Sequence, residues 1–425
     1  MENLDKTGII VEGKTKIIYG TTDPNLVIVQ SKDDITAGNG AKHDTISGKA
    51  SFANQTTCNV FRLLQQCQIP IAFKEQIGAE CFIAEKCRMV PFEVVIRREA
   101  DGSFLKRNPH FKKGHIFSKL VLEFFLKTSR KKWQGQDIPV DDPMAIFNFK
   151  DGGQELYLPD QPIAIQNPFL KIPDFPSKDE IKIMNDIGYM AKQVFLILEK
   201  AWQLQGRKLV DFKLEFGFNN DGELRLADVI DNDSWRVLED GNYIDKQIYR
   251  DGGDLNEVTA KYKKVAGLTG SFSLPRQQII LWRASEKDDI ESFQKAISGQ
   301  SVSVCVTTYS LHKQPGQAIQ ELTRQIQEIS DSVLIVYCGR SNGAGPTLSA
   351  HCTIPTITVP AGWENCHEDV WSSIHTPSGV PVATILDPKN AVLAALQILA
   401  MRNPLLYANL RMKQEERFSN FVPIE

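Results

Sequence analysis

Polar and apolar residues alternate along much of the first half of the chain, which is the pattern of strands with one buried face. This pattern predicts strands at 9–11, 16–19, 26–30, 92–98, 209–215 and 224–230. Two segments, 45–68 and 178–205, instead repeat apolar residues every three or four positions, as amphipathic helices do. The stretch 128–178 is rich in Pro, Gly and Lys and is expected to form loops. Together the segments predict an α+β domain with antiparallel sheets.

The pattern changes in the second half. Short, almost continuously apolar segments at 278–282, 302–307, 333–336 and 356–359 are separated by helical segments. Such strands are buried on both faces, which is typical of a three-layer α/β domain with a parallel sheet. A closing amphipathic helix is expected over 391–412. We therefore divide the chain into a first domain at 1–255, a linker at 256–275 and a second domain at 276–425.

Composition narrows the class of protein. A chain of 425 residues is too long for one core, and its 42% hydrophobic and 24% charged residues are those of a folded soluble protein. The net charge of -3 argues against a nucleic-acid-binding surface, and no apolar run is long enough to span a membrane. No secretory signal is visible, and the 8 cysteines form no C-x-x-C pair. We expect a cytoplasmic protein with reduced thiols and no structural zinc.

Two acidic clusters carry the strongest chemical signal. In the segment 211–217, alternation places Asp211, Lys213 and Glu215 on one face of a strand. Asp228, on the next predicted strand, can stand beside Glu215. Such carboxylates either face solvent or bind a ligand, and Mg²⁺ prefers one or two carboxylates plus substrate phosphates. A solvated sheet face is expected to interleave more Lys and Thr, so we favour a magnesium site.

Basic residues near glycines supply a second signal. Gly13, Lys14, Thr15 and Lys16 lie on a predicted hairpin, where glycine lets the backbone approach a phosphate, although the spacing is not that of a P-loop. After the strand at 92–98, a basic segment with serine and glycine suits a phosphate monoester. A glycine turn with surface lysines is the commoner explanation of the hairpin segment, and a solvated turn explains the basic segment equally well.

These residues belong to long motifs that resemble the animal bifunctional family in which SAICAR synthetase is fused to AIR carboxylase. The matching stretches are EGKTK (12–16), QSKDDITAGN (30–39), GSFLKRNP (102–109), LVDFKLEFG (209–217), LADVIDNDSWR (226–236) and DKQIYRD (245–251). The resemblance implies purine biosynthesis: carboxyaminoimidazole ribonucleotide (CAIR), L-aspartate and ATP give SAICAR, ADP and phosphate. ATP and Mg²⁺ are then the cofactors, and no biotin or flavin is expected.

The resemblance also implies roles for residues. Gly13, Lys14, Thr15 and Lys16 hold the ATP phosphates, and Glu215 and Asp228 carry Mg²⁺. Lys213, Glu215 and Asp228 act at the reacting groups. CAIR and aspartate are bound by Asp33, Arg97, Ser103, Asp211, Asp233, Arg236, Lys246 and Arg250. Asp101 departs from the threonine or alanine usual in the family and adds negative charge beside the phosphate-binding residues.

The second domain resembles AIR carboxylase, which forms CAIR from aminoimidazole ribonucleotide (AIR) and CO2, and the resemblance implies a homo-octamer assembled through this domain. His312 is the expected catalytic residue there. Substrate and CO2 would be bound by Ser310, Lys313, Gly339, Arg340, Ser341, Asn342 and Gly343. The segment 283–287, RASEK, departs from the family's phosphate-binding loop. Two readings stay open: a working carboxylase, or a catalytically disabled scaffold that drives oligomerisation.

Overall fold

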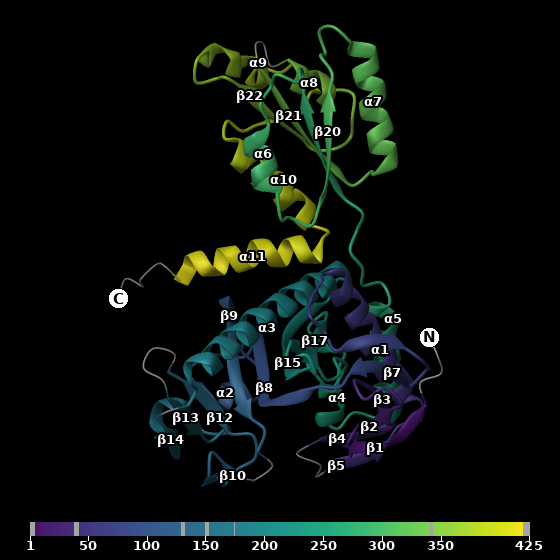
Figure 1. Ribbon diagram of the computed structural model, residues 1–425, viewed down its shortest axis with the longest axis vertical. Coiled ribbons are helices and arrows are strands. Elements are labelled where there is room, and N and C mark those ends of the chain that lie inside the picture. The colour runs from purple at the N-terminus through teal and green to yellow at the C-terminus, as the bar shows by residue number, and fades with distance from the viewer. Residues whose placement is uncertain are drawn as a thin grey trace. The chain divides into compact units, whose positions relative to one another are not determined.

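The computed structural model describes residues 5–37, 42–128, 132–148, 153–173, 175–339 and 343–419. The chain forms two compact units, one of Met1–Ser273 with Arg411–Glu425 and one of Leu274–Leu410. Each unit is described by itself (Figure 1). No helix in the described ranges is both long and apolar enough to cross a membrane.

The first unit begins with an antiparallel five-stranded sheet in the order β1-β2-β3-β7-β6. Its strands are β1 (Lys6–Glu12), β2 (Lys16–Thr21), β3 (Leu26–Ser31), β6 (Phe73–Gln76) and β7 (Cys81–Glu85). The predicted hairpin is present, because β1 and β2 pair across the turn that contains Gly13. Two short pairs lie outside this sheet, β4 (Asp34–Ala37) with β5 (Lys42–Thr45) and β10 (Lys132–Trp133) with β11 (Gln136–Asp137).

A nine-stranded antiparallel sheet forms the centre of the first unit. Its strands are β8 (Arg88–Glu99), β9 (Ile116–Leu126), β12 (Met144–Phe147), β13 (Gln154–Tyr157), β14 (Leu170–Ile172), β15 (Lys208–Phe218), β16 (Leu224–Ala227), β17 (Trp235–Glu239) and β18 (Asn242–Tyr243). The long helix α3 (Lys178–Leu204) packs along β8 and β15, as Figure 1 shows. Its capping box at Ser177 and Glu180 explains why it begins there.

The expectation of loops throughout 128–178 was wrong. Strands β12, β13 and β14 extend the central sheet from β9. Each strand has only three or four residues, and the sequences between them contain glycine or proline. Their pairing with neighbours, rather than a local pattern, makes them strands.

The linker expected at 256–275 was also wrong. Most of it is the helix α5 (Leu255–Thr269), which begins at the cap Asp254 and packs on α1 (Lys49–Gln66). Val258, Tyr262 and Val265 recur at helical spacing and are buried. Two shorter helices complete the unit, α2 (Ser103–Arg107) and α4 (Gln247–Arg250), with a 3₁₀ turn at Ile163–Ile165.

The second unit has a five-stranded parallel sheet in the order β20-β19-β21-β22-β23. The strands are β19 (Gln278–Arg283), β20 (Ser303–Thr308), β21 (Ser332–Gly339), β22 (Thr356–Ala361) and β23 (Ala383–Thr384). Apolar clusters cover both faces, with α6 (Glu291–Ile297) and α10 (Pro388–Ala400) on one side, and α7 (Pro315–Glu328) and α8 (Ala344–Ser349) on the other. This is the expected three-layer α/β arrangement.

The single closing helix expected over 391–412 is two helices, α10 and α11 (Pro404–Ser419). Pro404 has no backbone N–H and starts the second helix, while the Asn403 side chain accepts bonds from the N–H groups of Leu405 and Leu406. A 3₁₀ turn (His367–Val370) and α9 (Trp371–Ile374) lie between β22 and β23.

Candidate active site

A row of charged side chains follows one face of β15. Phe212 points the other way and stacks on Phe195 of α3, with ring centroids 5.4 Å apart. Because neighbouring strand residues point to opposite faces, Asp211, Lys213 and Glu215 all face away from α3. This face is where the two cavities of interest open.

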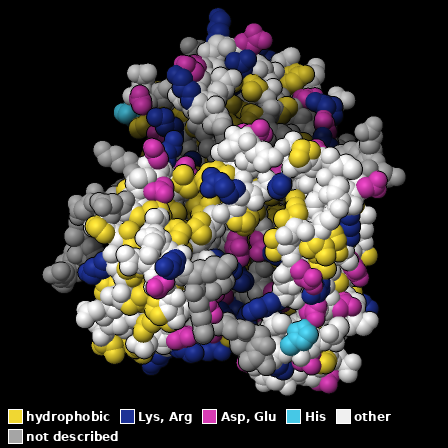
Figure 2. Space-filling view, turned by 60° about the horizontal axis from the view of Figure 1, so that its bottom comes forward, with side chains coloured by type: hydrophobic (Ala, Val, Ile, Leu, Met, Phe, Trp, Pro, Cys, Tyr) yellow, Lys and Arg dark blue, Asp and Glu magenta, His cyan; other side chains and the backbone are white. Residues whose placement is uncertain are grey.

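The Asp211 end of the face lines a cleft of about 290 Å³. Figure 2 shows a hollow in the surface in which acidic side chains lie, with Lys and Arg side chains around it. Among the residues that line the cleft are Lys213, predicted to act at the reacting groups, and six of the eight predicted to bind CAIR and aspartate: Arg97, Ser103, Asp211, Asp233, Arg236 and Arg250. Four arginines, counting Arg107, share the cleft with several carboxylates, so it suits a ligand that carries both anionic groups and hydrogen-bond donors.

Buried carboxylates hold two of these arginines in place. Arg97 donates from Nε to Glu123 at 2.6 Å and from Nη1 to Asp211. Arg107 donates from Nη2 to the other oxygen of Glu123 at 2.7 Å. Although burial opposes ionisation of Glu123, Arg97 and Arg107 hold its pKa below its ordinary value. The arginines therefore keep their charge and orientation before a ligand arrives.

Arg236 enters the cleft from β17 and lies against Gly102. Its Nη1 donates to Asp211 at 2.7 Å, so Asp211 joins Arg97 and Arg236. Its buried Nε has no hydrogen-bond partner. Gly102 has a φ of 55°, and a Cβ there would lie 2.7 Å from the Arg236 Cζ. Only glycine at this position leaves room for the guanidinium.

Asp233 is hydrogen-bonded to two buried side chains, those of Lys246 and Tyr262. Lys246 donates to Asp233 at 2.9 Å, and the hydroxyl of Tyr262 donates to its other oxygen. Although burial opposes ionisation, Lys49 and Lys246 hold the pKa of Asp233 far below its ordinary value. Burial and the charge of Asp233 raise the pKa of the neighbouring Asp231. Asp233 is thus a fixed negative charge at the cleft.

The Glu215 end of the same face opens into a second cavity of about 320 Å³, which is mostly apolar. Its apolar lining comes mainly from the five-stranded sheet and includes Val27, Phe73 and Phe82. Among its charged lining residues, Lys16 comes from β2 of the five-stranded sheet, Glu215 comes from β15 of the central sheet, and Asp228 follows β16. Apolar walls with a few convergent charges are typical of a pocket for a small aromatic ligand with a charged group.

Glu215 and Asp228 fit a magnesium ion that is completed by phosphate oxygens. Glu215 pairs with Ala227 in the register of β15 and β16, so Asp228 follows immediately beside it. Lys16 now pairs with Asp228, and Lys127 pairs with Glu215 at 3.1 Å. The described residues contain no group of three or more His, Cys, Asp or Glu with metal-ligand geometry. Two carboxylates alone suit Mg²⁺ that keeps water and phosphate as its other ligands.

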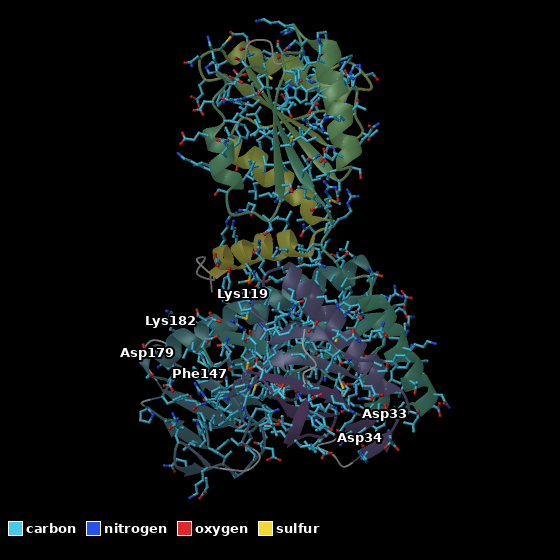
Figure 3. All side chains as sticks on the ribbon, turned by 45° about the vertical axis from the view of Figure 1, so that its right-hand side comes forward. Asp33, Asp34, Lys119, Phe147, Asp179 and Lys182 are labelled. Atoms are coloured by element: carbon cyan, nitrogen blue, oxygen red, sulfur yellow. The ribbon has the colours of Figure 1, made fainter. Side chains whose placement is uncertain are left out.

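Some predicted residues lie elsewhere. Asp33, shown beside Asp34 in Figure 3, accepts from the backbone N–H of Ala50 at 2.8 Å and so holds the start of α1 instead of lining the cleft. Lys14 is exposed on the hairpin turn and lines neither cavity. Gly13 and Thr15 shape that turn: Gly13 N–H donates to the Lys16 carbonyl, and Lys32 N–H donates to the Thr15 carbonyl.

The structure also adds residues that the sequence reasoning missed. Glu93 receives hydrogen bonds from Lys213 at 2.9 Å and ion-pairs with Lys127. Although burial opposes ionisation of Glu93, these lysines hold its pKa below the ordinary value. The available signal was a charged residue inside an apolar strand, as in the PFEVV segment that contains Glu93. Lys49, buried at the first turn of α1, gave no such signal.

In the second unit, the predicted residues follow the carboxyl ends of β20 and β21. Such ends meet at one edge of a parallel sheet, where ligands commonly bind. His312 and Lys313 are exposed, and Ser310 is partly buried. Gly339 ends β21 and Gly343 precedes α8, while Arg340, Ser341 and Asn342 lie outside the described residues.

The altered segment 283–287 lies at the same edge, after β19. Arg283 donates from Nε to Thr308 at 2.9 Å and from Nη1 to the Glu286 carbonyl at 3.2 Å. Asp288 accepts from the Ser285 N–H at 2.9 Å. The Arg283 guanidinium is therefore bound to its own loop and to β20.

Comparison with known proteins gives matches over both units. The SAICAR synthetase family matches residues 9–268, and the AIR carboxylase family matches residues 278–419. The bifunctional phosphoribosylaminoimidazole carboxylase/phosphoribosylaminoimidazole succinocarboxamide synthetase of Drosophila melanogaster is 34% identical, over 98% of this chain and 94% of the relative. The human protein of that name is 35% identical, over 95% and 92%. The phosphoribosylaminoimidazole-succinocarboxamide synthase of Chloroflexus aurantiacus is 40% identical, over 62% and 96%.

Proposed function

Since this chain belongs to the SAICAR synthetase family, with an AIR carboxylase domain after it, we propose that its first unit joins CAIR and L-aspartate at the expense of ATP. Its family membership makes the chain a bifunctional enzyme of purine biosynthesis. The residue roles, the metal and the assembly that follow are part of the proposal.

The observation that carries the proposal is the charged face of β15, which runs between the two cavities. Asp211 lies at the cleft, and Glu215 lies at the apolar pocket. Four residues of strand span about 13 Å. A nucleotide whose base lies in the apolar pocket would thus place its phosphates along this face, toward a substrate in the cleft.

In the apolar pocket we assign Lys16 to the ATP phosphates, while Gly13, Lys14 and Thr15 shape and charge the hairpin turn. Burial lowers the pKa of Lys16 to about 8, against the attraction of Glu215 and Asp231. Glu215 and Asp228 would hold Mg²⁺, which supplies positive charge to the transferring phosphoryl group.

In the cleft we assign Arg97, Ser103 and Arg236 to the phosphate of CAIR. Asp211 holds both arginines, so it orients them rather than binding phosphate itself. Lys213, Asp233 and Arg250 remain for the CAIR carboxylate and ribose and for aspartate. Lys246 acts through Asp233, to which it donates. Asp33, predicted as a ligand of substrate, would act only by holding α1.

The chemistry needs no protein nucleophile. A carboxylate is a poor acylating group, so the CAIR carboxylate is activated by phosphorylation, and the amine of aspartate then displaces phosphate. The contribution of the protein is to position the reactants and to supply charge where negative charge develops. Lys213, between the two cavities on β15, is the cation placed to do so.

The test is formation of SAICAR by the purified chain from CAIR, L-aspartate and Mg-ATP. We expect turnover that requires all three substrates. ATP hydrolysis without incorporation of aspartate, or no turnover at any Mg²⁺ concentration, would overturn the assignment.

For the second unit, the carboxylase and the scaffold both remain as candidates. The Arg283 bonds to Thr308 and to its own loop favour the scaffold, because a phosphate would have to displace them. For the carboxylase, His312, Ser310 and Lys313 would act beside the Gly339–Gly343 loop without biotin, flavin or metal. CAIR formation from AIR and bicarbonate decides between the two readings.

A cytoplasmic homo-octamer assembled through the second unit is part of this proposal. The mass of the whole chain in solution, measured by light scattering, tests it. A monomeric whole chain would refute it.

A further inference from the structure

A buried carboxylate lies directly beside the cleft arginines and has no role in the chemistry above. Asp101 joins the end of β8 to Gly102 and is only 7% exposed. A buried acid beside a phosphate-binding arginine competes with the ligand unless it has another function.

Both oxygens of this carboxylate are occupied. Oδ1 accepts from the backbone N–H of Gly102 at 2.6 Å, and Oδ2 accepts from the hydroxyl of Tyr243 at 2.5 Å. Tyr243 comes from β18, at the edge of the central sheet, and Lys113 lies over its ring at 4.9 Å. The carboxylate therefore ties the Gly102 turn to a strand distant in sequence.

The backbone turn at Gly102 contacts the Arg236 side chain and limits its position. The guanidinium fits against Gly102 where a Cβ would collide, and its Nη1 is held on the other side by Asp211. Negative charge on Asp101 attracts Arg236, since it contributes, after Asp211, to raising the pKa of Arg236 against the effect of burial.

We propose that Asp101, held by Tyr243, is a positioning residue that orients Arg236 for the phosphate of CAIR. Asp101 does not touch the substrate. It fixes the turn that limits where the guanidinium can lie, and its charge keeps the arginine on that side. Because the Gly102 N–H is occupied by Asp101, the turn offers no backbone donor there, and phosphate binding depends more heavily on Arg236.

The proposal rests on the proposed synthetase function, and the experiment measures KM for CAIR, L-aspartate and ATP in Asp101→Ala, Asp101→Asn and Tyr243→Phe. We expect KM for CAIR to rise about tenfold in Asp101→Ala and less in the other two variants. Loss of a hydrogen bond to a charged group weakens binding by about a factor of ten. The KM values for ATP and aspartate and the kcat should stay within about twofold.

Two further readouts separate positioning from simple destabilisation. The variant that combines Asp101→Ala and Tyr243→Phe should bind CAIR no worse than Asp101→Ala alone, because Tyr243 acts through Asp101. The affinity for the CAIR nucleoside, which lacks the phosphate, should be the same in Asp101→Ala and in the unchanged enzyme.

Tyr157→Phe is the matched control. It removes a hydroxyl bond to Glu155 of 2.6 Å, outside the cleft, and should change no KM. KM does not depend on the fraction of folded enzyme, so partial unfolding of Asp101→Ala leaves the test valid, and Asp101→Asn keeps the shape of the side chain.

An unchanged KM for CAIR in Asp101→Ala, or an equal loss for CAIR and its nucleoside, overturns the positioning role while the synthetase assignment stands. Absence of SAICAR formation by the unchanged enzyme refutes the proposed function instead, so the two failures are distinguishable.

Discussion

Replacing Gly102 by alanine should weaken phosphate recognition in addition to the loss of stability that the backbone alone causes. The added Cβ would lie 2.7 Å from the Arg236 Cζ, which is well inside van der Waals contact. The guanidinium is the mobile end of a long side chain, so it moves at little steric cost, but moving it breaks its bond of 2.7 Å to Asp211. Loss of a charge-assisted hydrogen bond costs about 1.5–3 kcal/mol.

A displaced guanidinium also loses its charge-assisted hydrogen bond to the phosphate of CAIR, and a loss of that size corresponds to a rise in KM for CAIR of about 10- to 150-fold at unchanged kcat. Gly114 provides the control, since it also has a positive φ, 81°, but nothing lies within 4 Å of its added Cβ. Both alanine variants should lose about 1–3 kcal/mol of unfolding free energy from the backbone alone. Steady-state kinetics and urea unfolding of the two variants make the comparison.

If Gly102→Ala and Gly114→Ala show the same KM for CAIR, the close approach of Arg236 to Gly102 has no part in binding and the reasoning is refuted. A Gly102→Ala enzyme that melts far below Gly114→Ala would show instead that the turn serves mainly the fold.

Four further predictions follow from the described contacts. Arg236→Ala should raise KM for CAIR at least about tenfold while the fold survives, and unchanged kinetics would remove Arg236 from the site. Glu215→Gln should lower kcat and raise the Mg²⁺ concentration needed for half-maximal rate, whereas normal turnover at low Mg²⁺ would contradict the metal assignment. Val265→Ala, fully buried in α5, should destabilise the first unit by about 2 kcal/mol in urea unfolding, and no change would mean that this segment is a linker after all. Burial raises the pKa of Asp245 from 3.8 to about 7. Because the folded state then binds the proton more tightly than the unfolded state, stability should fall as pH rises from about 4 to 7, and Asp245→Asn should flatten this slope in melting curves.

Much of the fold follows from local periodicity. The strand that carries Asp211 and Glu215 and the helix at 178–204 lie where alternation and helical spacing predict them, and the four long parallel strands lie where nearly continuous apolar runs predict them. The failures have two causes. Strands of three or four residues such as β12 and β14 have too little length to show a pattern, and the helix at 255–269 was hidden by the glycines that flank it.

The local sequence also determined which side chains share the face of β15, because a strand with period two leaves no choice once one side packs on Phe195. The local sequence did not determine which residues of other strands contact these side chains. Glu123 on β9 holds Arg97 and Arg107, and Tyr243 on β18 holds Asp101, across separations of 16 to 142 residues. Such partners depend on strand order and register, which only long-range pairing of the sheet decides.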